Sequence, residues 1–370
     1  MKAIIIGSGI VGSSTAYHLA RKGIEVVVVD KAHQGQATAA GAGIVCPWIS
    51  SVENEDWYTI ARRGALYYPK LVAALKEDGE EELGYKMVGA IAVSKDNQEL
   101  DALERKALLR AKDTPEVGEV SRLSAEEARK LFPPLEEELK AIYVSGGARV
   151  DGRSLRDAMQ RAGKKHGVIR YEGEARPVVS DGKVTGVEVD GESISADKVI
   201  VTAGAWTKEL LAPLGIDIHI EPQRGQIVHF SLQDVDTSHW PVVIPQNSYY
   251  MLAFDDSRVV VGATRESGTG FDYRLTASGV KEVIEAGLDI APGLADSTLH
   301  EMRIGFRPAG PDVLPLLGTV ESVENLVIST GLGPSGITMG PYVGALAGEI
   351  ALENEIDIEL SPYDPLRKQV

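Results

Sequence analysis

The chain has little cysteine, no long apolar run and a deficit of positive charge. Its single cysteine, Cys46, excludes a disulfide within the chain and a cysteine-based metal cluster. No run approaches the roughly 18 apolar residues that a membrane helix needs, and the apolar N-terminus reads as a strand and helix rather than a secretory signal. With 38 Lys and Arg against 54 Asp and Glu, the formal charge of −16 argues against a nucleic-acid partner. These absences favour a globular, cytoplasmic protein.

The length of the chain indicates the number of domains, and the spacing of its histidines bears on metal binding. A chain of 370 residues predicts roughly two domains, and 44% hydrophobic residues suffice for a substantial core. The seven histidines are dispersed without the spacing of metal ligands. We therefore expect no metal site.

The first thirty residues contain the most informative pattern. An apolar run breaks at a turn with Gly7, Gly9 and Gly12, a helix-period segment follows, and a second apolar run ends on Asp30. This is typical of a strand, a tight turn, a helix and a second strand. Gly7 allows a sharp exit from the strand, Gly9 lets the backbone approach a pyrophosphate, and Gly12 lets the helix pack closely on the sheet.

The acid that closes this unit makes dinucleotide binding the favoured interpretation. Asp30 follows Gly12 by 18 residues, near the roughly 20-residue spacing at which a carboxylate accepts both hydroxyls of an adenosine ribose. The helix N-terminus would present free N–H groups and a positive dipole end to the phosphates. A glycine triplet alone is ordinary turn chemistry, but here it follows a strand, opens a helix and is matched by the acid. The pattern does not say which dinucleotide binds.

The rest of the chain alternates between strand-and-helix patterns and the strand-rich patterns of an antiparallel sheet. Two Asp-Gly pairs, at 181–182 and 190–191, predict hairpins within a small meander. A segment rich in predicted strands follows from about residue 218. The chain closes with a strand over 325–330, a glycine turn and a helix reaching about Leu352. Helices are also expected at 57–75, at 99–111, after a Ser124 capping box, from Asp151 and at 278–288. This alternation predicts two interleaved domains.

Several of these segments together resemble the FAD-dependent D-amino acid oxidase superfamily, most closely its bacterial branch of glycine oxidases and D-amino acid dehydrogenases. The resemblance covers essentially the whole chain and lies in the N-terminal fingerprint and in residues 38–43, 201–206, 260–264, 305–308 and 331–336. It implies an α/β (α+β, two-domain) fold. A Rossmann-like FAD-binding domain, residues 1–84, 145–218 and 301–370, is interleaved with an antiparallel-sheet substrate domain, residues 85–144 and 219–300.

The resemblance also implies which residues hold FAD. The sarcosine-oxidase branch attaches its flavin through a cysteine near the position of Phe306, and this chain has none there, so we expect noncovalent FAD. The expected cofactor-binding residues are Gly7, Gly9, Ile10, Val11, Gly12, Asp30, Lys31, Thr38, Ala39, Ala42, Gly43, Val45, Val178, Ala203, Gly204, Trp206, Arg307, Gly333, Gly336, Ile337 and Thr338.

Arg307 is the main candidate for substrate binding. In the family the matching arginine pairs with the substrate carboxylate, a task that suits a guanidinium fork; the competing interpretation is a structural ion pair. Tyr249 and Tyr250 point to opposite faces of one strand, and the resemblance selects Tyr250. Trp48 and Gln246 could line the same cavity. Glycine oxidases carry an arginine where this chain has Pro334, which leaves the substrate preference open.

The resulting hypothesis is FAD-dependent oxidative deamination of a small amino acid, a D-amino acid or glycine. Hydride would move from Cα to flavin N5, giving an imine that water hydrolyses to a keto acid and ammonia, with no protein acid or base required. The alternative is an oxidase or dehydrogenase of N-substituted amino acids such as sarcosine or proline. Remoter alternatives are an NAD-dependent dehydrogenase and a non-catalytic flavin-binding subunit. Oxygen or a quinone would reoxidise the flavin, and the oligomeric state, a homo-oligomer included, stays open.

Overall fold

The computed structural model describes residues 1–367. The larger of its two main sheets is built around the N-terminal strand. Strand β1 (Lys2–Ile6) lies between β2 (Glu25–Asp30) and β13 (Lys198–Val201), and the three run parallel. Their near-continuous apolar runs are what parallel strands covered on both faces require. The remaining strands of this nine-stranded sheet are β9 (Ile169–Glu172), β10 (Ala175–Ser180), β11 (Lys183–Val189), β12 (Glu192–Ser195), β19 (Leu316–Val320) and β20 (Val323–Thr330).

Two helices begin at the same edge of this sheet. Helix α1 (Ile10–Arg21) follows β1, and α9 (Gly336–Ala351) follows β20 after the 3₁₀ turn η5 (Gly333–Ser335). The strands are parallel, so both helix N-termini lie beside their carboxyl ends. The helices approach so closely that a Cβ on Gly344 would lie 2.4 Å from the Val11 carbonyl oxygen. Strand, glycine turn and helix thus occur twice, as the sequence predicts.

Both predicted Asp-Gly hairpins are confirmed. Asp181 and Gly182 have φ values of 50° and 76° and join β10 to β11, while Asp190 and Gly191 have φ values of 50° and 90° and join β11 to β12. Two consecutive positive φ values fit the turn that matches the twist of a two-residue hairpin.

The second sheet has eight strands and is antiparallel except for one pair, β15 with β5. In sheet order its strands are β18 (Thr298–Ala309), β14 (Glu221–Ser231), β17 (Arg258–Gly262), β16 (Tyr250–Ala253), β15 (Val242–Pro245), β5 (Ala90–Ser94), β7 (Lys140–Val144) and β6 (Val120–Leu123). Strand β18 pairs with β14 from Thr298 to Ala309. The predicted domain boundary at residue 301 therefore falls inside a strand, and the chain returns to the first sheet only after Ala309.

Helices cover the second sheet where the sequence predicts them. They are α4 (Asn97–Asp113), α5 (Ala125–Leu131) and α8 (Ala277–Ile290). Helix α5 begins with the predicted capping box, in which the Ser124 and Glu127 side chains each accept a backbone N–H of the other residue.

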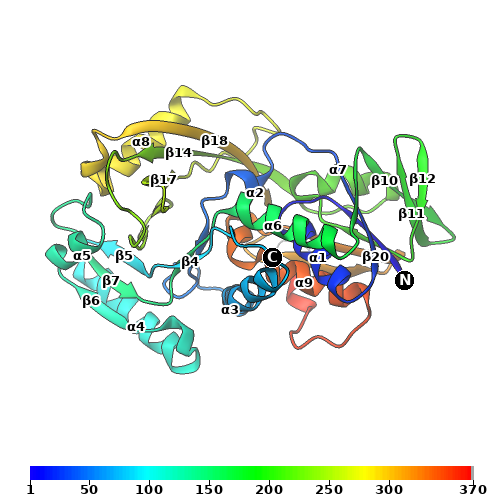
Figure 1. The fold of residues 1–370 in the computed structure, drawn as a ribbon, viewed down its shortest axis with the longest axis horizontal. Coiled ribbons are helices and arrows are strands. Elements are labelled where there is room, and N and C mark those ends of the chain that lie inside the picture. Colours follow the sequence, from blue (N-terminus) through cyan, green and yellow to red (C-terminus); the bar gives the residue numbers. More distant parts are fainter. Residues whose placement is uncertain (368–370) are drawn as a thin grey trace.

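Helices and a small sheet lie between the two main sheets (Figure 1). A small sheet of β3 (Ile44–Val45), β8 (Ala148–Arg149) and β4 (Lys86–Met87) joins segments that are far apart in sequence. The helices of this central region are α2 (Ala37–Ala40), α3 (Glu55–Glu77) and α6 (Gly152–Lys165), while α7 (Thr207–Leu211) lies beside the first sheet. They bring the carboxyl edge of the first sheet to the second sheet.

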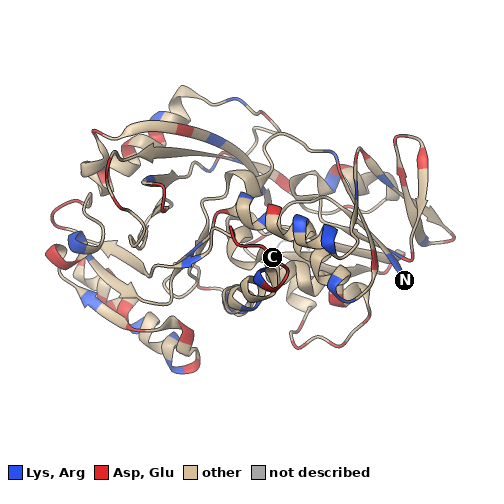
Figure 2. Ribbon diagram, viewed as in Figure 1, with Lys and Arg blue, Asp and Glu red and all other residues tan. Residues whose placement is uncertain are grey.

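Acidic and basic residues are interspersed over both halves of the molecule (Figure 2). Within residues 1–367, no helix has the length and apolar character needed to cross a membrane.

Candidate active site

A cavity of about 450 Å³ lies between the carboxyl edge of the first sheet and one face of the second. Many predicted site residues, from both sheets, line it together. They are Gly7, Gly9, Ile10, Val11, Asp30, Lys31, Thr38, Ala42, Gly43, Ala203, Gly204, Trp206, Tyr250, Arg307, Gly333, Gly336, Ile337 and Thr338.

The glycine turn after β1 presents backbone to this cavity. Gly7 has a φ of 101°, and a Cβ there would lie 2.5 Å from the Thr202 carbonyl oxygen. Gly12 does not line the cavity; a Cβ there would lie 2.0 Å from the Gly7 carbonyl oxygen. Its place is therefore the close contact of helix and strand that the sequence predicts, while Gly9 lines the cavity, where a Cβ would lie 3.3 Å from Thr38 Oγ1.

Asp30 lies at the end of β2 beside this turn. Its Oδ2 accepts the Ser8 N–H at 2.5 Å and its Oδ1 accepts the Ala32 N–H at 2.6 Å. Oδ1 also accepts a hydrogen bond from Gln36 Nε2 at 3.1 Å. A carboxylate has about four lone-pair positions, so acceptor capacity is left for a hydroxyl group in the cavity. Residues 173–175 line the cavity next to it, with the Gly173 N–H donated to the Asp30 carbonyl oxygen at 3.1 Å.

Val178 does not reach the cavity, in contrast to its predicted place beside the adenine. It lies on β10 with 37% of its surface exposed, paired with Gly186 of β11. Residues 173–175, at the entry to β10, line the cavity instead. The structure thus places the start of β10, and not Val178, at the cavity.

The start of α9 and the loop before β3 form a second wall. A Cβ on Gly43 would lie 1.9 Å from the Val150 carbonyl oxygen, and one on Gly41 would lie 2.9 Å from Cγ1 of Ile337. Thr338 Oγ1 donates to the Ile44 carbonyl oxygen at 2.9 Å. No side chain caps α9, and the residues of its first turn line the cavity, so the positive end of its dipole faces the cavity.

Arg307 occupies the part of the cavity formed by the second sheet. Its Nη1 donates to the Thr264 carbonyl oxygen at 2.9 Å, and burial lowers its pKa. Within residues 1–367 no carboxylate lies within ion-pair distance of it. A Cβ on Gly225 would be 2.9 Å from the Arg307 Cζ, so the guanidinium lies against bare backbone. The arrangement leaves a partly buried cation with a face open to the cavity.

The two neighbouring tyrosines have different surroundings. Burial raises the pKa of Tyr250, and the nearby charges of Arg307 and Arg265 oppose that shift. Tyr249 also lines the cavity, but its hydroxyl donates to Glu282 Oε1 at 2.7 Å. Tyr250 is thus the tyrosine beside the guanidinium.

Some predicted residues lie outside the lining for identifiable reasons. Trp48 is 2% exposed and its indole Nε1 donates to the Gly146 carbonyl oxygen at 2.9 Å. The Gln246 amide lies against the Ile244 carbonyl oxygen at 3.4 Å. The complete set outside the lining is Gly12, Ala39, Val45, Trp48, Val178 and Gln246.

Other lining residues were not predicted. His33 stacks on Trp206 with ring centroids 4.5 Å apart, and Trp206 stacks on Phe271 at 4.8 Å. Arg265 and Gly225 also belong to the lining. A signal was available for Arg265, which directly follows the strand that ends in Gly262, Ala263 and Thr264.

Comparison with known proteins identifies the family. The family model described as FAD dependent oxidoreductase (DAO) matches residues 2–350. The chain belongs to this family. DAO enzymes are FAD-dependent, and the lining fits that cofactor: Gly7 and Gly9 expose backbone in the turn, Asp30 has acceptor capacity, and two helix N-termini meet the cavity.

Individual DAO relatives resemble the whole chain. An uncharacterised oxidoreductase, YurR, of Bacillus subtilis is 48% identical over 363 residues, covering 98% of each chain. The glycine oxidase of Pseudomonas aeruginosa is 28% identical over 373 residues, again 98% of each chain. The crystal structure of an iminodiacetate oxidase from Chelativorans sp. BNC1 superimposes with a TM-score of 0.95 at 51% identity, covering 98% of each chain.

Proposed function

We propose that the protein oxidises a small amino acid at the bond between Cα and the amine nitrogen. The observation that carries the proposal is the guanidinium of Arg307, which faces the cavity without a carboxylate partner among residues 1–367. A substrate carboxylate would complete it with two parallel charged hydrogen bonds. The product would be an imine, which water hydrolyses to a keto acid and ammonia, or to a keto acid and an amine if the nitrogen is substituted.

Between primary and N-substituted amino acids, the comparisons favour the second. The iminodiacetate oxidase, whose named substrate is a secondary amine, is 51% identical, whereas the glycine oxidase of P. aeruginosa is 28% identical. We therefore infer a preference for N-substituted substrates, with glycine and D-amino acids as the second candidates.

The protein's own contribution is binding and orientation. Bound FAD supplies the hydride acceptor. Arg307 would hold the carboxylate, and Tyr250 would restrict the space beside it, so that Cα has one orientation. With a neutral amine the chain needs no acid or base.

We further propose that FAD is bound noncovalently. Phe306 is buried against the Trp206 edge, with ring centroids 6.2 Å apart. Cys46 lines the cavity, but burial raises the pKa of its thiol to about 12. A thiol that stays protonated is a poor nucleophile.

The test is an anaerobic substrate panel. The holoenzyme is mixed separately with sarcosine, L-proline, glycine and D-alanine, and the flavin absorbance is followed. Bleaching by at least one amino acid, fastest for an N-substituted one, is expected. A flavin that none of them bleaches, with iminodiacetate included, would overturn the proposal. Repeating the reaction with oxygen or an artificial acceptor then distinguishes an oxidase from a dehydrogenase.

A further inference from the structure

A second guanidinium, that of Arg265, lines the same cavity as Arg307. It follows β17 at the start of the loop that leads to α8. Within the described chain, residues 1–367, no carboxylate lies within ion-pair distance of Arg265. Cavity-lining residues between 225 and 308 include these two arginines and no Asp or Glu. This part of the cavity therefore has two positive charges and no internal negative charge to balance them.

The backbone register directs Arg265 toward Arg307. Glu266 and Arg224 exchange backbone hydrogen bonds of 2.9 and 3.0 Å, as opposed residues of antiparallel strands do. Side chains alternate along an extended chain, so Arg265 points to the side opposite Glu266. That is the side on which Gly225 lies, and the Arg307 guanidinium covers Gly225. Burial is the main cause that lowers the pKa of Arg307, and the charge of Arg265 contributes to the same shift.

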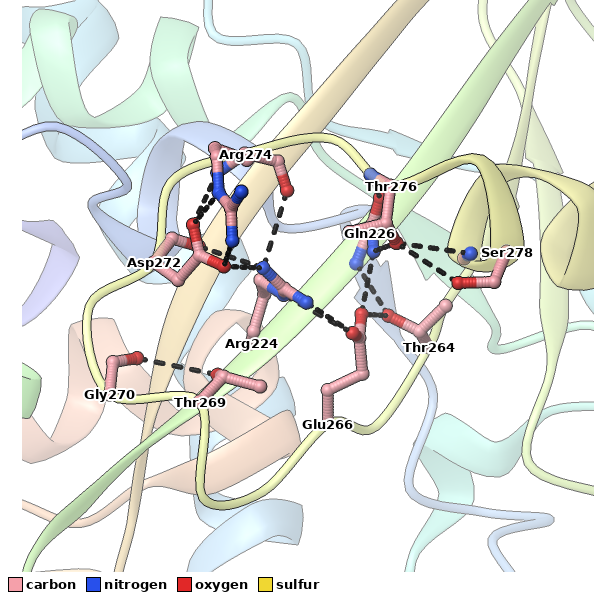
Figure 3. Close-up of polar contacts among 11 residues, drawn as sticks. Arg224, Gln226, Thr264, Glu266, Thr269, Gly270, Asp272, Arg274, Thr276 and Ser278 are labelled. Atoms are coloured by element: carbon pink, nitrogen blue, oxygen red, sulfur yellow. Dashed lines mark hydrogen bonds and ion pairs between the residues drawn. The ribbon is translucent and has the colours of Figure 1, made fainter.

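A network of charged and polar contacts fixes the loop from which Arg265 projects (Figure 3). Arg224, which is 4% exposed, pairs with Glu266 at 2.6 Å and with Asp272 at 3.0 Å. Glu266 also accepts hydrogen bonds from Gln226 at 2.7 Å and Thr264 at 2.8 Å. Both acids of this loop thus pair with Arg224, outside the cavity lining, and Arg265 faces the cavity.

The same part of the lining also contains neutral hydrogen-bond donors. Asn247 and Ser248 line the cavity in the turn before β16. A carboxylate in this region could accept hydrogen bonds from a guanidinium, an amide and a hydroxyl. A methyl or other apolar group would leave those donors without partners, at a cost in binding.

We propose that Arg265 binds a second carboxylate of the substrate, so that the enzyme prefers amino dicarboxylates over amino monocarboxylates. The inference rests on the proposed function, because Arg307 must hold the first carboxylate. The second carboxylate can be attached to the nitrogen, as in iminodiacetate, or to the side chain, as in aspartate. In both cases the substrate has one net negative charge, which the two arginines complement.

Binding of unreactive isosteres tests the proposal without turnover. Glutarate is iminodiacetate with CH₂ in place of NH, and butyrate is sarcosine with the same exchange. The holoenzyme is titrated with each, and the perturbation of the flavin spectrum gives Kd. Because charged hydrogen bonds contribute about 1.5 to 3 kcal/mol, we expect glutarate to bind at least about tenfold more tightly than butyrate. In Arg265→Met the Kd for glutarate should rise by at least about tenfold, the Kd for butyrate should change less than about twofold, and Arg265→Lys should restore part of the difference.

Arg274→Met is the matched control. Its side chain is 82% exposed and pairs with Asp272 in the same loop, outside the cavity lining. We expect wild-type Kd values for both isosteres in this variant. Equal binding of glutarate and butyrate by the wild type, or an equal loss of both in Arg265→Met, would overturn the proposal.

Turnover shows where the second carboxylate is attached and separates the two proposals. A selective loss of kcat/KM in Arg265→Met for iminodiacetate relative to sarcosine supports a carboxylate on nitrogen. A selective loss for D-aspartate relative to D-alanine supports one on the side chain. If Arg265→Met changes neither the ratio of kcat/KM for iminodiacetate to that for sarcosine nor the ratio for D-aspartate to D-alanine, the second-carboxylate proposal fails while the proposed function stands. If no amino acid is oxidised, the proposed function fails.

Discussion

A single methyl group at Gly225 should disable Arg307 without removing a polar atom. A Cβ on Gly225 would lie 2.9 Å from Cζ and Nη2 of Arg307 and 3.0 Å from its Nη1, whereas ordinary contacts begin at 3.4 Å. The guanidinium must therefore withdraw by about 0.5 Å, away from its bond to the Thr264 carbonyl oxygen. Gly225 lies within β14, paired with Gly305 of β18, in a backbone conformation open to alanine. Strain in the strand should thus be small.

The expected loss follows from the displacement. A misplacement of 1 Å can cost about a hundredfold in rate, so Gly225→Ala should lower kcat/KM by about tenfold. Complete removal in Arg307→Ala breaks a buried charge pair with the substrate, a loss of about 2 to 5 kcal/mol. At about 1.4 kcal/mol per tenfold, this corresponds to about thirtyfold or more in kcat/KM.

The assay is a double-mutant cycle measured by steady-state kinetics, with the flavin spectrum as the control for an intact cofactor site. If Gly225→Ala acts through the guanidinium, it should add little in the Arg307→Ala background. Wild-type kinetics in Gly225→Ala would refute the reasoning. So would a tenfold effect that persists in the absence of Arg307, because the methyl group would then act on something else.

Two further predictions concern the cofactor and stability. Asp30→Ala should weaken FAD binding by roughly tenfold to a hundredfold through the loss of charged hydrogen bonds, measured as Kd for the apoprotein; unchanged retention would contradict the ribose assignment. His229 accepts a hydrogen bond from Arg258 at 3.0 Å, and burial, assisted by the charges of Arg303 and Arg258, lowers its pKa from 6.5 to about 3. Between those values the unfolded chain binds one more proton than the folded chain, so the free energy of unfolding should fall by about 1.4 kcal/mol per pH unit as the pH drops. Urea unfolding should show a shallower pH dependence for His229→Gln, and an identical dependence would exclude this contribution.

Local chemistry explains which elements could be predicted from the sequence. The turn at Gly7 follows from backbone that must approach Thr202 closely, and Asp-Gly pairs supply the two positive φ values of each hairpin. Ser124 and Glu127 form a capping box through contacts three residues apart. Such features depend on neighbours in the sequence, and the sequence therefore identifies them.

The features that the sequence could not predict depend on contacts between distant segments. Trp48 is conspicuous beside a cavity-lining loop, but its indole is occupied by Gly146, which is 98 residues away. Arg265 reaches the cavity because Glu266 pairs with Arg224, which is 42 residues earlier. The extent of β18 depends on its register with β14. Neither spacing nor composition specifies these pairings.

The central claim is that this chain holds FAD in the cavity between its two sheets, and the purified protein tests it most directly. We predict a yellow protein that releases FAD, at about one per chain, when denatured without proteolysis, as noncovalent binding requires. The apoprotein should regain the absorbance of bound flavin when FAD is supplied. A colourless protein that takes up no FAD would contradict the account, and flavin that stays attached to the denatured chain would contradict noncovalent binding.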